Sequence, residues 1–300
     1  MTGRSIRDRK SKVRIDDVAP VPTTLPPDFL DRFPNILGGN DLKEITTSIL
    51  EARKKDKPVI LAFGAHLIKT GMSKVICQLI RNDIITGIAT NGASLVHDTE
   101  LAIFGHTSEE VDEGIVEGTF GTTEETAGFI NNSINNLVPK GYGIGRALGH
   151  SLAPTPGLHI KSSIFATAFR YDIPATCHVA LGTDVWQCFS NSNWSLIGQG
   201  AFRDFEIFTK SVKHLGGGGV FLNFGSAVII PEVFLKAVAI NRAEGVDFTD
   251  MVAADFDMIR QYRPQTRIVQ TANNLGGKGY SITCQYELLL PILAALLTGK

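Results

Sequence analysis

The chain has 300 residues, of which 43% are hydrophobic, and a formal net charge of −1. This near-neutral balance provides no positive field for a phosphate backbone, so no nucleic-acid partner is expected. No apolar run approaches the roughly 20 residues of a membrane span, so no membrane partner is expected either. The four cysteines form no C-x-x-C pair, and the N-terminus has no apolar signal core. We therefore expect a cytoplasmic protein with reduced thiols, without a disulfide or a zinc site.

Residues 1–40 differ in composition from the rest. MTGRSIRDRKSKVR is basic and polar, and APVPTTLPP is rich in proline. This composition predicts a flexible arm followed by an extended linker. The alternative is an arm that packs on a neighbouring subunit. Residues 41–300 then form the folded part, which begins with a helix that Asp41 can cap.

The stretch from residue 57 to residue 98 predicts a strand, a helix and a second strand. Residues 58–63 are an apolar, partly β-branched run, and a second apolar run covers residues 84–89. Between them, apolar residues recur at helical spacing. Two parallel strands joined by a crossover helix place both following turns at the carboxyl edge of one sheet, which is where open α/β sheets bind ligands.

The middle of the chain is less regular. Helices are predicted at residues 94–104 and 124–137, with little periodicity between them and a loop over residues 141–157. The glycines of Gly141-Tyr142-Gly143-Ile144-Gly145 superficially resemble a dinucleotide-binding loop. Their spacing differs from G-x-G-x-x-G and no strand precedes them, so this segment is predicted to be a flexible loop.

The second half again alternates strands and helices. Helices are predicted at residues 160–169, 202–215 and 231–242, and strands at 174–181, 220–224, 250–254 and 280–285, before a last apolar helix. No linker separates the two halves. The pattern predicts a single large domain of βα units with a mostly parallel sheet.

Small or polar residues follow four of the predicted strands: Gly64-Ala65-His66, Thr90-Asn91-Gly92-Ala93, Gly182-Thr183-Asp184 and Gly225-Ser226. Glycine lets the backbone approach a ligand, and a following helix N-terminus favours phosphate. Asp184 and Asp255 could bind ribose hydroxyls or an amine. However, βα turns contain Gly and Asp in any such protein, so position alone does not establish a site.

The seven histidines show no metal-ligand spacing, and no metal is expected. His66 and His97 stand apart because both follow predicted carboxyl edges. Lys278 lies in a glycine-rich loop before the last strand, where a desolvated lysine could form an imine. An ordinary exposed loop lysine is the alternative.

In the order of its segments, the chain resembles deoxyhypusine synthase over roughly residues 40–298. The family's F-x-S-N-L-I-x-x-G is matched by residues 63–71, and its T-T-A-G-G by residues 89–94. Its S-I-x-x-T-A and C-P-A-L-T-D-G stretches are similar to residues 163–168 and 177–184. Further similar segments are residues 222–226, 252–257 and 285–291.

This resemblance implies a Rossmann-like fold with helices on both faces of the sheet, and a homotetramer. It implies NAD as cofactor and spermidine as substrate, with hydride transfer followed by aminobutyl transfer through a lysine imine to a protein lysine, as in hypusine formation. The residues that would bind NAD are Ala65, His66, Leu67, Thr90, Asn91, Gly92, Ala93, Asp184, Gly225, Ser226 and Asp255. Lys278 is the counterpart of the imine-forming lysine. Because an amine must lose a proton before hydride leaves, His97 is the candidate base.

The chain departs from the family at residues that carry chemistry. The paired histidines after the glycine-rich strand are replaced by residues 227–230, Ala-Val-Ile-Ile, and no tryptophan precedes Lys278. The leading hypothesis is therefore an NAD-dependent enzyme that acts on a polyamine or related amine, with a protein lysine or a small amine as possible acceptor. The alternative is a catalytically inactive homologue that binds NAD or another ligand.

Overall fold

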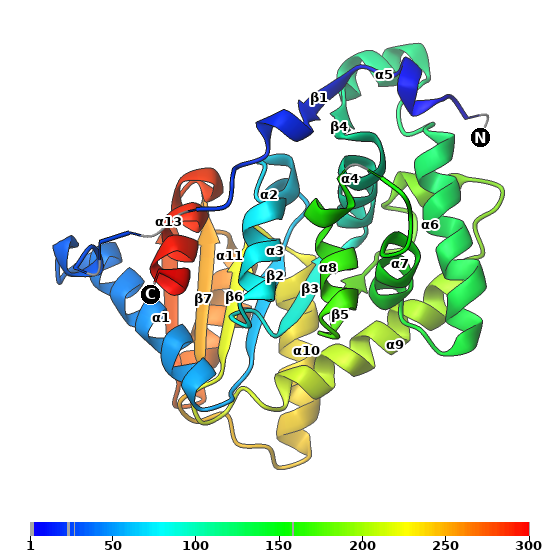
Figure 1. Cartoon of the computed structure of the whole chain (residues 1–300). Helices are drawn as coiled ribbons and strands as arrows, with labels where there is room; N and C mark the ends of the chain where they lie inside the picture. Colours follow the sequence, from blue (N-terminus) through cyan, green and yellow to red (C-terminus); the bar gives the residue numbers. More distant parts are fainter. Residues whose placement is uncertain (1–2, 23–24, 27, 158, 300) are drawn as a thin grey trace.

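The computed structural model describes residues 3–22, 25–26, 28–157 and 159–299. A six-stranded sheet with the order β5-β3-β2-β6-β7-β8 forms its centre, and every pair in it is parallel (Figure 1). The strands are β2 (Val59–Phe63), β3 (Gly87–Asn91), β5 (Ala175–His178), β6 (Val220–Phe224), β7 (Val252–Asp257) and β8 (Lys278–Thr283). The strand order runs outward in opposite directions from β2 and β6, so a topological switch point lies between these two strands.

Helices cover both faces of the sheet. The α-helices are α1 (Leu37–Lys54), α2 (His66–Lys69), α3 (Ser73–Arg81), α4 (Gly92–Phe104), α5 (Val111–Glu117), α6 (Glu124–Leu137), α7 (Ile144–Leu152), α8 (Ile164–Arg170), α9 (Trp194–Val212), α10 (Ile229–Ala243), α11 (Tyr262–Pro264), α12 (Gln270–Asn274) and α13 (Tyr286–Thr298). A π-helical turn joins α11 to α12. The predicted fold class, a Rossmann-like α/β domain with a parallel sheet between helical layers, is confirmed.

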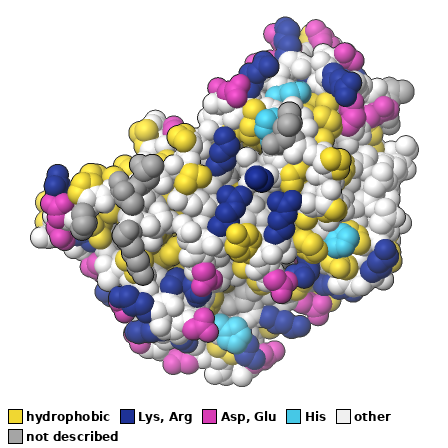
Figure 2. Space-filling model, in the orientation of Figure 1, with side chains coloured by type: hydrophobic (Ala, Val, Ile, Leu, Met, Phe, Trp, Pro, Cys, Tyr) yellow, Lys and Arg dark blue, Asp and Glu magenta, His cyan; other side chains and the backbone are white. Residues whose placement is uncertain are grey.

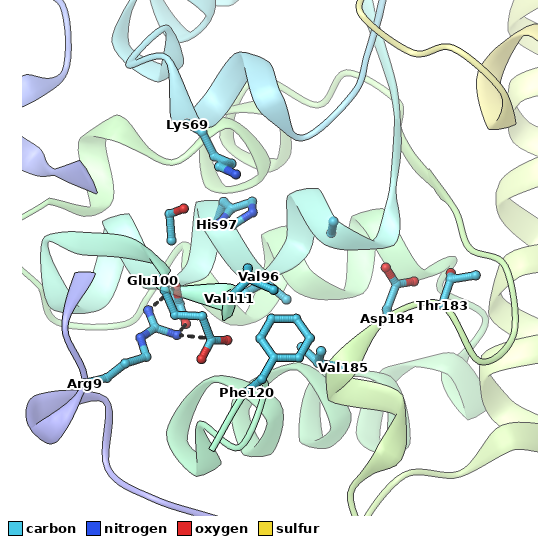
Figure 3. A pocket seen from close by; sticks show the side chains of 13 residues that line it. Arg9, Lys69, Val96, His97, Glu100, Val111, Phe120, Thr183, Asp184 and Val185 are labelled. Atoms are coloured by element: carbon cyan, nitrogen blue, oxygen red, sulfur yellow. Dashed lines mark hydrogen bonds and ion pairs between the residues drawn. The ribbon is translucent and has the colours of Figure 1, made fainter. Parts of the chain in front are cut away.

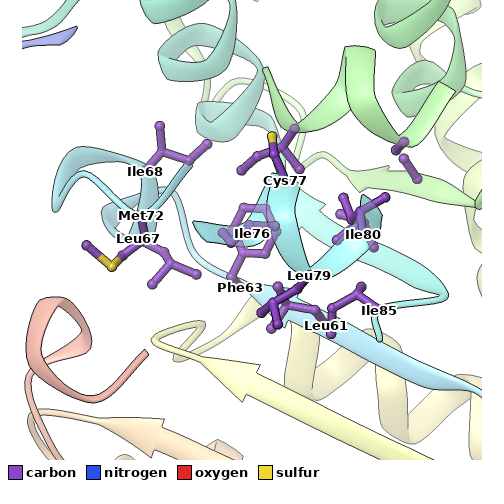
Figure 4. Close-up of a cluster of buried hydrophobic side chains, with 14 of the residues drawn as sticks. Leu61, Phe63, Leu67, Ile68, Met72, Ile76, Cys77, Leu79, Ile80 and Ile85 are labelled. Carbon is purple, nitrogen blue, oxygen red and sulfur yellow. The ribbon is translucent and has the colours of Figure 1, made fainter. Parts of the chain in front are cut away.

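The side chains of β2 point alternately to the two faces of the sheet, and each face has its own hydrophobic core. Leu61 and Phe63 belong to a core with α1, α3, α8 and α13, whereas Ile60 and Ala62 belong to a core with α9, α10 and α12. Because successive strand side chains point to opposite faces, one fully buried strand supplies both cores. Figure 4 shows Leu61 and Phe63 packed against Ile76 and its neighbours.

The segment after residue 141 is a helix, α7, and the prediction of a loop is wrong there. Its glycines are required by close packing: a Cβ on Gly145 would lie 2.2 Å from the Ala175 carbonyl oxygen, and one on Gly149 would lie 2.5 Å from that of Phe165. Glycine lowers helix propensity, which hides the helix in the sequence. The predicted strand at residues 84–89 begins later, at Gly87, because the N–H groups of Ile84 and Ile85 bond back to Leu79.

The N-terminal segment is more structured than its composition predicts. Strand β1 (Ser11–Arg14) pairs antiparallel with β4 (His106–Glu109), and Ile6 is fully buried. The N–H of Arg4 also donates to the Thr122 carbonyl oxygen. This segment therefore lies along α4 and α5 of its own chain, where a flexible arm was predicted (Figure 1). None of the helices in the described ranges combines the length and apolar character needed to cross a membrane.

Candidate functional site

The turns after β2 and β6 meet at the switch point of the sheet. The N–H of Gly64 donates to the Phe224 carbonyl oxygen at 3.0 Å. A Cβ on Gly64 would lie 2.6 Å from the Gly225 carbonyl oxygen, and Gly225 itself has a φ of 65°. These glycines are thus needed for the close contact between two backbone turns at the carboxyl edge.

A polar cluster lies beside this contact. The side-chain amide of Asn223 donates to Asp255 Oδ1 at 2.8 Å and to the Ser226 carbonyl oxygen at 3.1 Å. The Oδ1 atom of Asn223 is buried and has no hydrogen-bond partner among the described residues. Burial raises the pKa of Asp255 to about 6. The structure thus places Gly225, Ser226 and Asp255, three residues predicted from the sequence, close together. Beside them lies the buried Asn223 Oδ1, an acceptor without a partner among the described residues.

Three other predicted cofactor residues do not line the cavity described below. Leu67 is fully buried in the core. The buried Thr90 hydroxyl donates to the Phe63 carbonyl oxygen at 2.8 Å and so joins β3 to β2. His66 is exposed at the start of α2, next to Ala65, and its ring packs edge-on against Tyr286. These residues support the fold of the edge.

A cavity of about 220 Å³ lies at the same edge, between α4, the loop after β5 and the N-terminal segment (Figure 3). Three residues predicted from the sequence line it: Ala93, His97 and Asp184. The other lining residues are Arg9, Lys69, Val96, Glu100, Ser108, Glu109, Val111, Phe120, Thr183 and Val185. We refer to this cavity as the α4 pocket.

Asp184 lies over the N-terminus of α4. Asn91 caps this helix by accepting from the Ser94 N–H, and Gly92 follows it. A Cβ on Gly92 would overlap the Asp184 carboxylate, so glycine is what allows the carboxylate to reach this place. Asp184 accepts one hydrogen bond, from Gln187 Nε2 at 3.1 Å, and desolvation raises its pKa to about 6.

His97 is held by a chain of hydrogen bonds that fixes its tautomer. The Thr107 hydroxyl donates to Glu100 Oε2 at 2.6 Å and lies 2.7 Å from His97 Nδ1. Because the single hydroxyl proton goes to Glu100, Nδ1 must donate to Thr107, and Nε2 keeps its lone pair. Desolvation lowers the pKa of His97 to about 4, so the ring is neutral at pH 7. His97 therefore offers an unprotonated nitrogen to the pocket.

The N-terminal segment completes this chain of bonds through Arg9. Its guanidinium makes two parallel hydrogen bonds to Glu100, at 2.9 Å and 2.8 Å, and the Thr126 hydroxyl donates to the same carboxylate at 3.0 Å. The side chains of Arg9 and Glu100 are 3% and 1% exposed. This is a buried, bidentate ion pair whose charges are both matched.

The structure corrects the role predicted for Lys278. It is the first residue of β8, in register with Val252 at the amino end of β7, so it lies at the opposite edge of the sheet from Gly92 and Asp184. Its exposed ammonium binds Glu44 on α1 at 2.9 Å. In an all-parallel sheet the start of every strand lies at the amino edge, and the register confirms this position for Lys278. The predicted imine relay through Lys278 is therefore wrong.

Four site residues were missed by the sequence reasoning: Lys69, Arg9, Thr107 and Glu100. Glu100 and Lys69 each lie on a predicted helix, but nothing in the helical spacing marks them as facing a cavity. Arg9 was assigned to a flexible arm, and Thr107 to a segment without periodicity. Within the described ranges, no group of three or more His, Cys, Asp or Glu residues is placed to hold a metal ion.

The geometry defines an α/β protein with a polar and apolar pocket at the carboxyl edge of a doubly wound sheet. No family model matches the chain, and no curated protein matches it. Solved structures resemble it in fold. An arginine dihydrolase, ArgZ, from cyanobacteria is 15% identical with a TM-score of 0.52, over 88% of this chain and 33% of that one.

Two further structures cover more of their own length. A conserved putative LOR/SDH protein from Methanococcus maripaludis S2 is 15% identical with a TM-score of 0.51, over 86% of this chain and 67% of that one. A putative deoxyhypusine synthase from Entamoeba histolytica is 12% identical with a TM-score of 0.52, over 89% of this chain and 92% of that one. The chain spans about a third of the length of ArgZ. At these identities the likeness is one of fold, and the predicted resemblance to deoxyhypusine synthase is confirmed at that level alone.

Proposed function

We propose that the protein is an NAD-dependent enzyme that oxidises a small amine in the α4 pocket. The observation that carries the proposal is the pairing, in one pocket, of a neutral His97 with a free Nε2 and an Asp184 carboxylate. A carboxylate can hold an ammonium group, and an imidazole can take a proton from it. Aminobutyl transfer to a protein lysine is not part of the proposal, because Lys278 is at the other edge.

The residues of the β6–α10 turn fit a dinucleotide. The N–H groups of Ser226, Ala227 and Val228 donate no hydrogen bond within the described ranges, and they precede the N-terminus of a 15-residue helix. Such N–H groups at a helix start favour phosphate. Beside them lie the unpartnered Asn223 Oδ1 and the Asp255 carboxylate, which suit ribose hydroxyls. At α4, by contrast, the Asp184 carboxylate covers the helix start and repels phosphate.

This assignment is consistent with one of the similar folds. A structure of AgrE, the ternary complex with ornithine and NAD+, is 16% identical with a TM-score of 0.50, over 86% of this chain and 32% of that one. NAD, when bound, supplies the acceptor for a hydride from the carbon that bears the amine. The chain's own residues would do the rest: Asp184 holds the ammonium, and His97 Nε2 takes its proton so that the nitrogen lone pair can form the imine as the hydride leaves.

Two measurements test the proposal. Calorimetry with NAD measures cofactor binding, and NADH absorbance measures turnover with a panel of diamines, monoamines and amino acids. We expect binding, and turnover of at least one amine. His97→Gln should lower turnover by about 10²- to 10⁴-fold and leave NAD affinity unchanged. His214→Gln, at an exposed position just after the C-terminal end of α9 and outside the pocket lining, is the matched control.

The outcomes separate the hypotheses. Failure to bind NAD would overturn the proposal. Binding of NAD without oxidation of any amine would favour the second candidate, a ligand-binding protein without catalysis. The position of Lys278 favours this second candidate, because the lysine that the imine relay requires lies at the other edge of the sheet.

A further inference from the structure

Two opposite charges in the α4 pocket lack an ion-pair partner among the described residues. The side-chain ammonium of Lys69, the last residue of α2, makes no ion pair or hydrogen bond with them, and of these residues only the neutral amide of Gln187 bonds the Asp184 carboxylate. In Figure 3 the Lys69 side chain points into the pocket toward His97, and Asp184 enters from another side. Charged groups that a protein half buries without partners are suited to a charged ligand.

The other charges of the pocket are already matched. Glu100 is paired with Arg9 and also accepts from Thr107 and Thr126. Glu109 accepts from the Gly121 N–H at 3.1 Å and from Arg4 at 3.4 Å. His97 is neutral. Within the described ranges, the lining of the pocket therefore offers a ligand one cation and one carboxylate that have no ion-pair partner.

The remaining walls strengthen both charges. They are apolar and include Val96, Val111, Phe120 and Val185. Apolar walls exclude water, so a charge pair formed inside the pocket is screened less than one on the surface. A ligand with a short apolar body and a charged group at each end would match this arrangement.

We propose that the ligand of the α4 pocket is a small aminocarboxylate, whose carboxylate binds Lys69 and whose ammonium binds Asp184. The inference rests on the proposed function for the identity of the pocket and deepens it by naming the substrate class. A diamine or polyamine fits less well, because its second ammonium would lie beside the Lys69 ammonium. A fatty acid without the amine would leave Asp184 buried and unmatched, which is costly.

The test is calorimetry on the full chain without NAD. The ligands are straight-chain aminocarboxylates of increasing length, each with its matched diamine and its matched fatty acid. We expect one of the aminocarboxylates to bind, with at least tenfold higher affinity than its diamine and its fatty acid. Each lost charge-assisted contact is worth about 1.5–3 kcal/mol, which corresponds to roughly 10- to 150-fold in affinity.

Two variants assign the contacts. Lys69→Met, which keeps the length of the side chain, should lower aminocarboxylate affinity at least tenfold and reverse the preference toward the diamine. Asp184→Asn should lower the affinity for the aminocarboxylate until it equals the affinity for the matched fatty acid. Lys74→Met is the control, because Lys74 is a half-buried lysine on the next helix, outside the pocket.

Two results would overturn the inference: a diamine that binds the parent protein as tightly as the aminocarboxylate, or Lys69→Met acting no differently from Lys74→Met. Because NAD is absent from these titrations, this failure is distinguishable from failure of the proposed function. Aminocarboxylate binding without NAD binding would uphold the ligand class and reject the oxidation.

Discussion

At the scale of single residues, Thr107 decides which nitrogen of His97 carries the proton. Its hydroxyl has one proton and two neighbours, and the carboxylate of Glu100 can only accept. A base is useful only if its lone pair faces the substrate. The orientation of a single hydroxyl therefore directs the Nε2 lone pair of His97 toward the pocket.

We predict that in the Thr107→Val variant the side chain of His97 is no longer restricted to the Nδ1–H tautomer. The variant leaves Nδ1 without an acceptor, so nitrogen NMR of the His97 side chain should change from a single Nδ1–H form to a mixture. It should also lower the free energy of unfolding by about 1–3 kcal/mol, the cost of an unsatisfied buried group. Thr107→Ser keeps the hydroxyl and should retain the parental spectrum. A parent protein with its proton on Nε2 would contradict the prediction.

At the scale of elements, β1 ties the N-terminal segment to the pocket wall. The strand pairs with β4, and Arg9, just before it, reaches Glu100 on α4. The ion pair is buried, so removal of one partner strands the other charge in a medium of low dielectric. The surface pair of Lys12 on β1 and Glu110, the residue after β4, is half-exposed and surrounded by solvent.

We predict that Arg9→Met lowers the free energy of unfolding in urea by about 3–5 kcal/mol. Lys12→Met should cost at most about 1 kcal/mol, because surface pairs are weak. The double variant Arg9→Met, Glu100→Gln should recover part of the loss, since the stranded charge is gone. Equal costs for the Arg9 and Lys12 variants would show that the Arg9 pair contributes no more than a surface contact.

At the scale of the whole molecule, buried carboxyl groups link stability to pH. Asp204 on α9 is fully buried, and its Oδ2 accepts from the N–H groups of Gly145 at 3.0 Å and Cys177 at 2.9 Å. Burial raises the pKa of Asp204 to about 7. In the unfolded chain the same group ionises near its usual pKa of about 4. Unfolding between these two values therefore releases a proton.

It follows that Asp204 makes the protein less stable as pH rises from about 4 to about 7. Asn at this position keeps one acceptor oxygen and does not titrate, so Asp204→Asn should lose less stability across this interval than the parent. Urea unfolding at pH values through the interval measures the difference between the two slopes. The raised pKa values of Asp184 and Asp255 act in both proteins and cancel. Parallel slopes would contradict the prediction.

The sequence predicted the sheet well because its strands are short apolar runs between polar turns. Residues 220–224 were placed at their observed bounds, and the helix at residues 124–137 was as well. The sequence patterns did not indicate α7, where Gly145 and Gly149 serve packing, or β1, a short polar strand that pairs with β4 outside the main sheet. Both elements depend on contacts between distant segments, which local propensity does not report.

Part of the site was predictable because some of its residues directly follow strands of the sheet. His97, Ala93 and Asp184 follow strands, so the carboxyl-edge rule finds them. Lys278 was misplaced because a lysine before a strand lies at the amino edge, and the sequence reasoning read its loop without that distinction. Arg9 lies just before β1, and Thr107 lies on β4 behind His97; both strands stand outside the main sheet.

The backbone contact at Gly64 and Gly225 has a consequence for how this protein can acquire a new specificity. Main-chain atoms fill that junction, so any side chain added at Gly64 must displace a carbonyl group, and the junction cannot be varied. The apolar wall of the pocket carries no such restriction. A library selected for altered ligand preference should therefore accumulate changes at Val96, Val111, Phe120 and Val185, while both glycines stay unchanged.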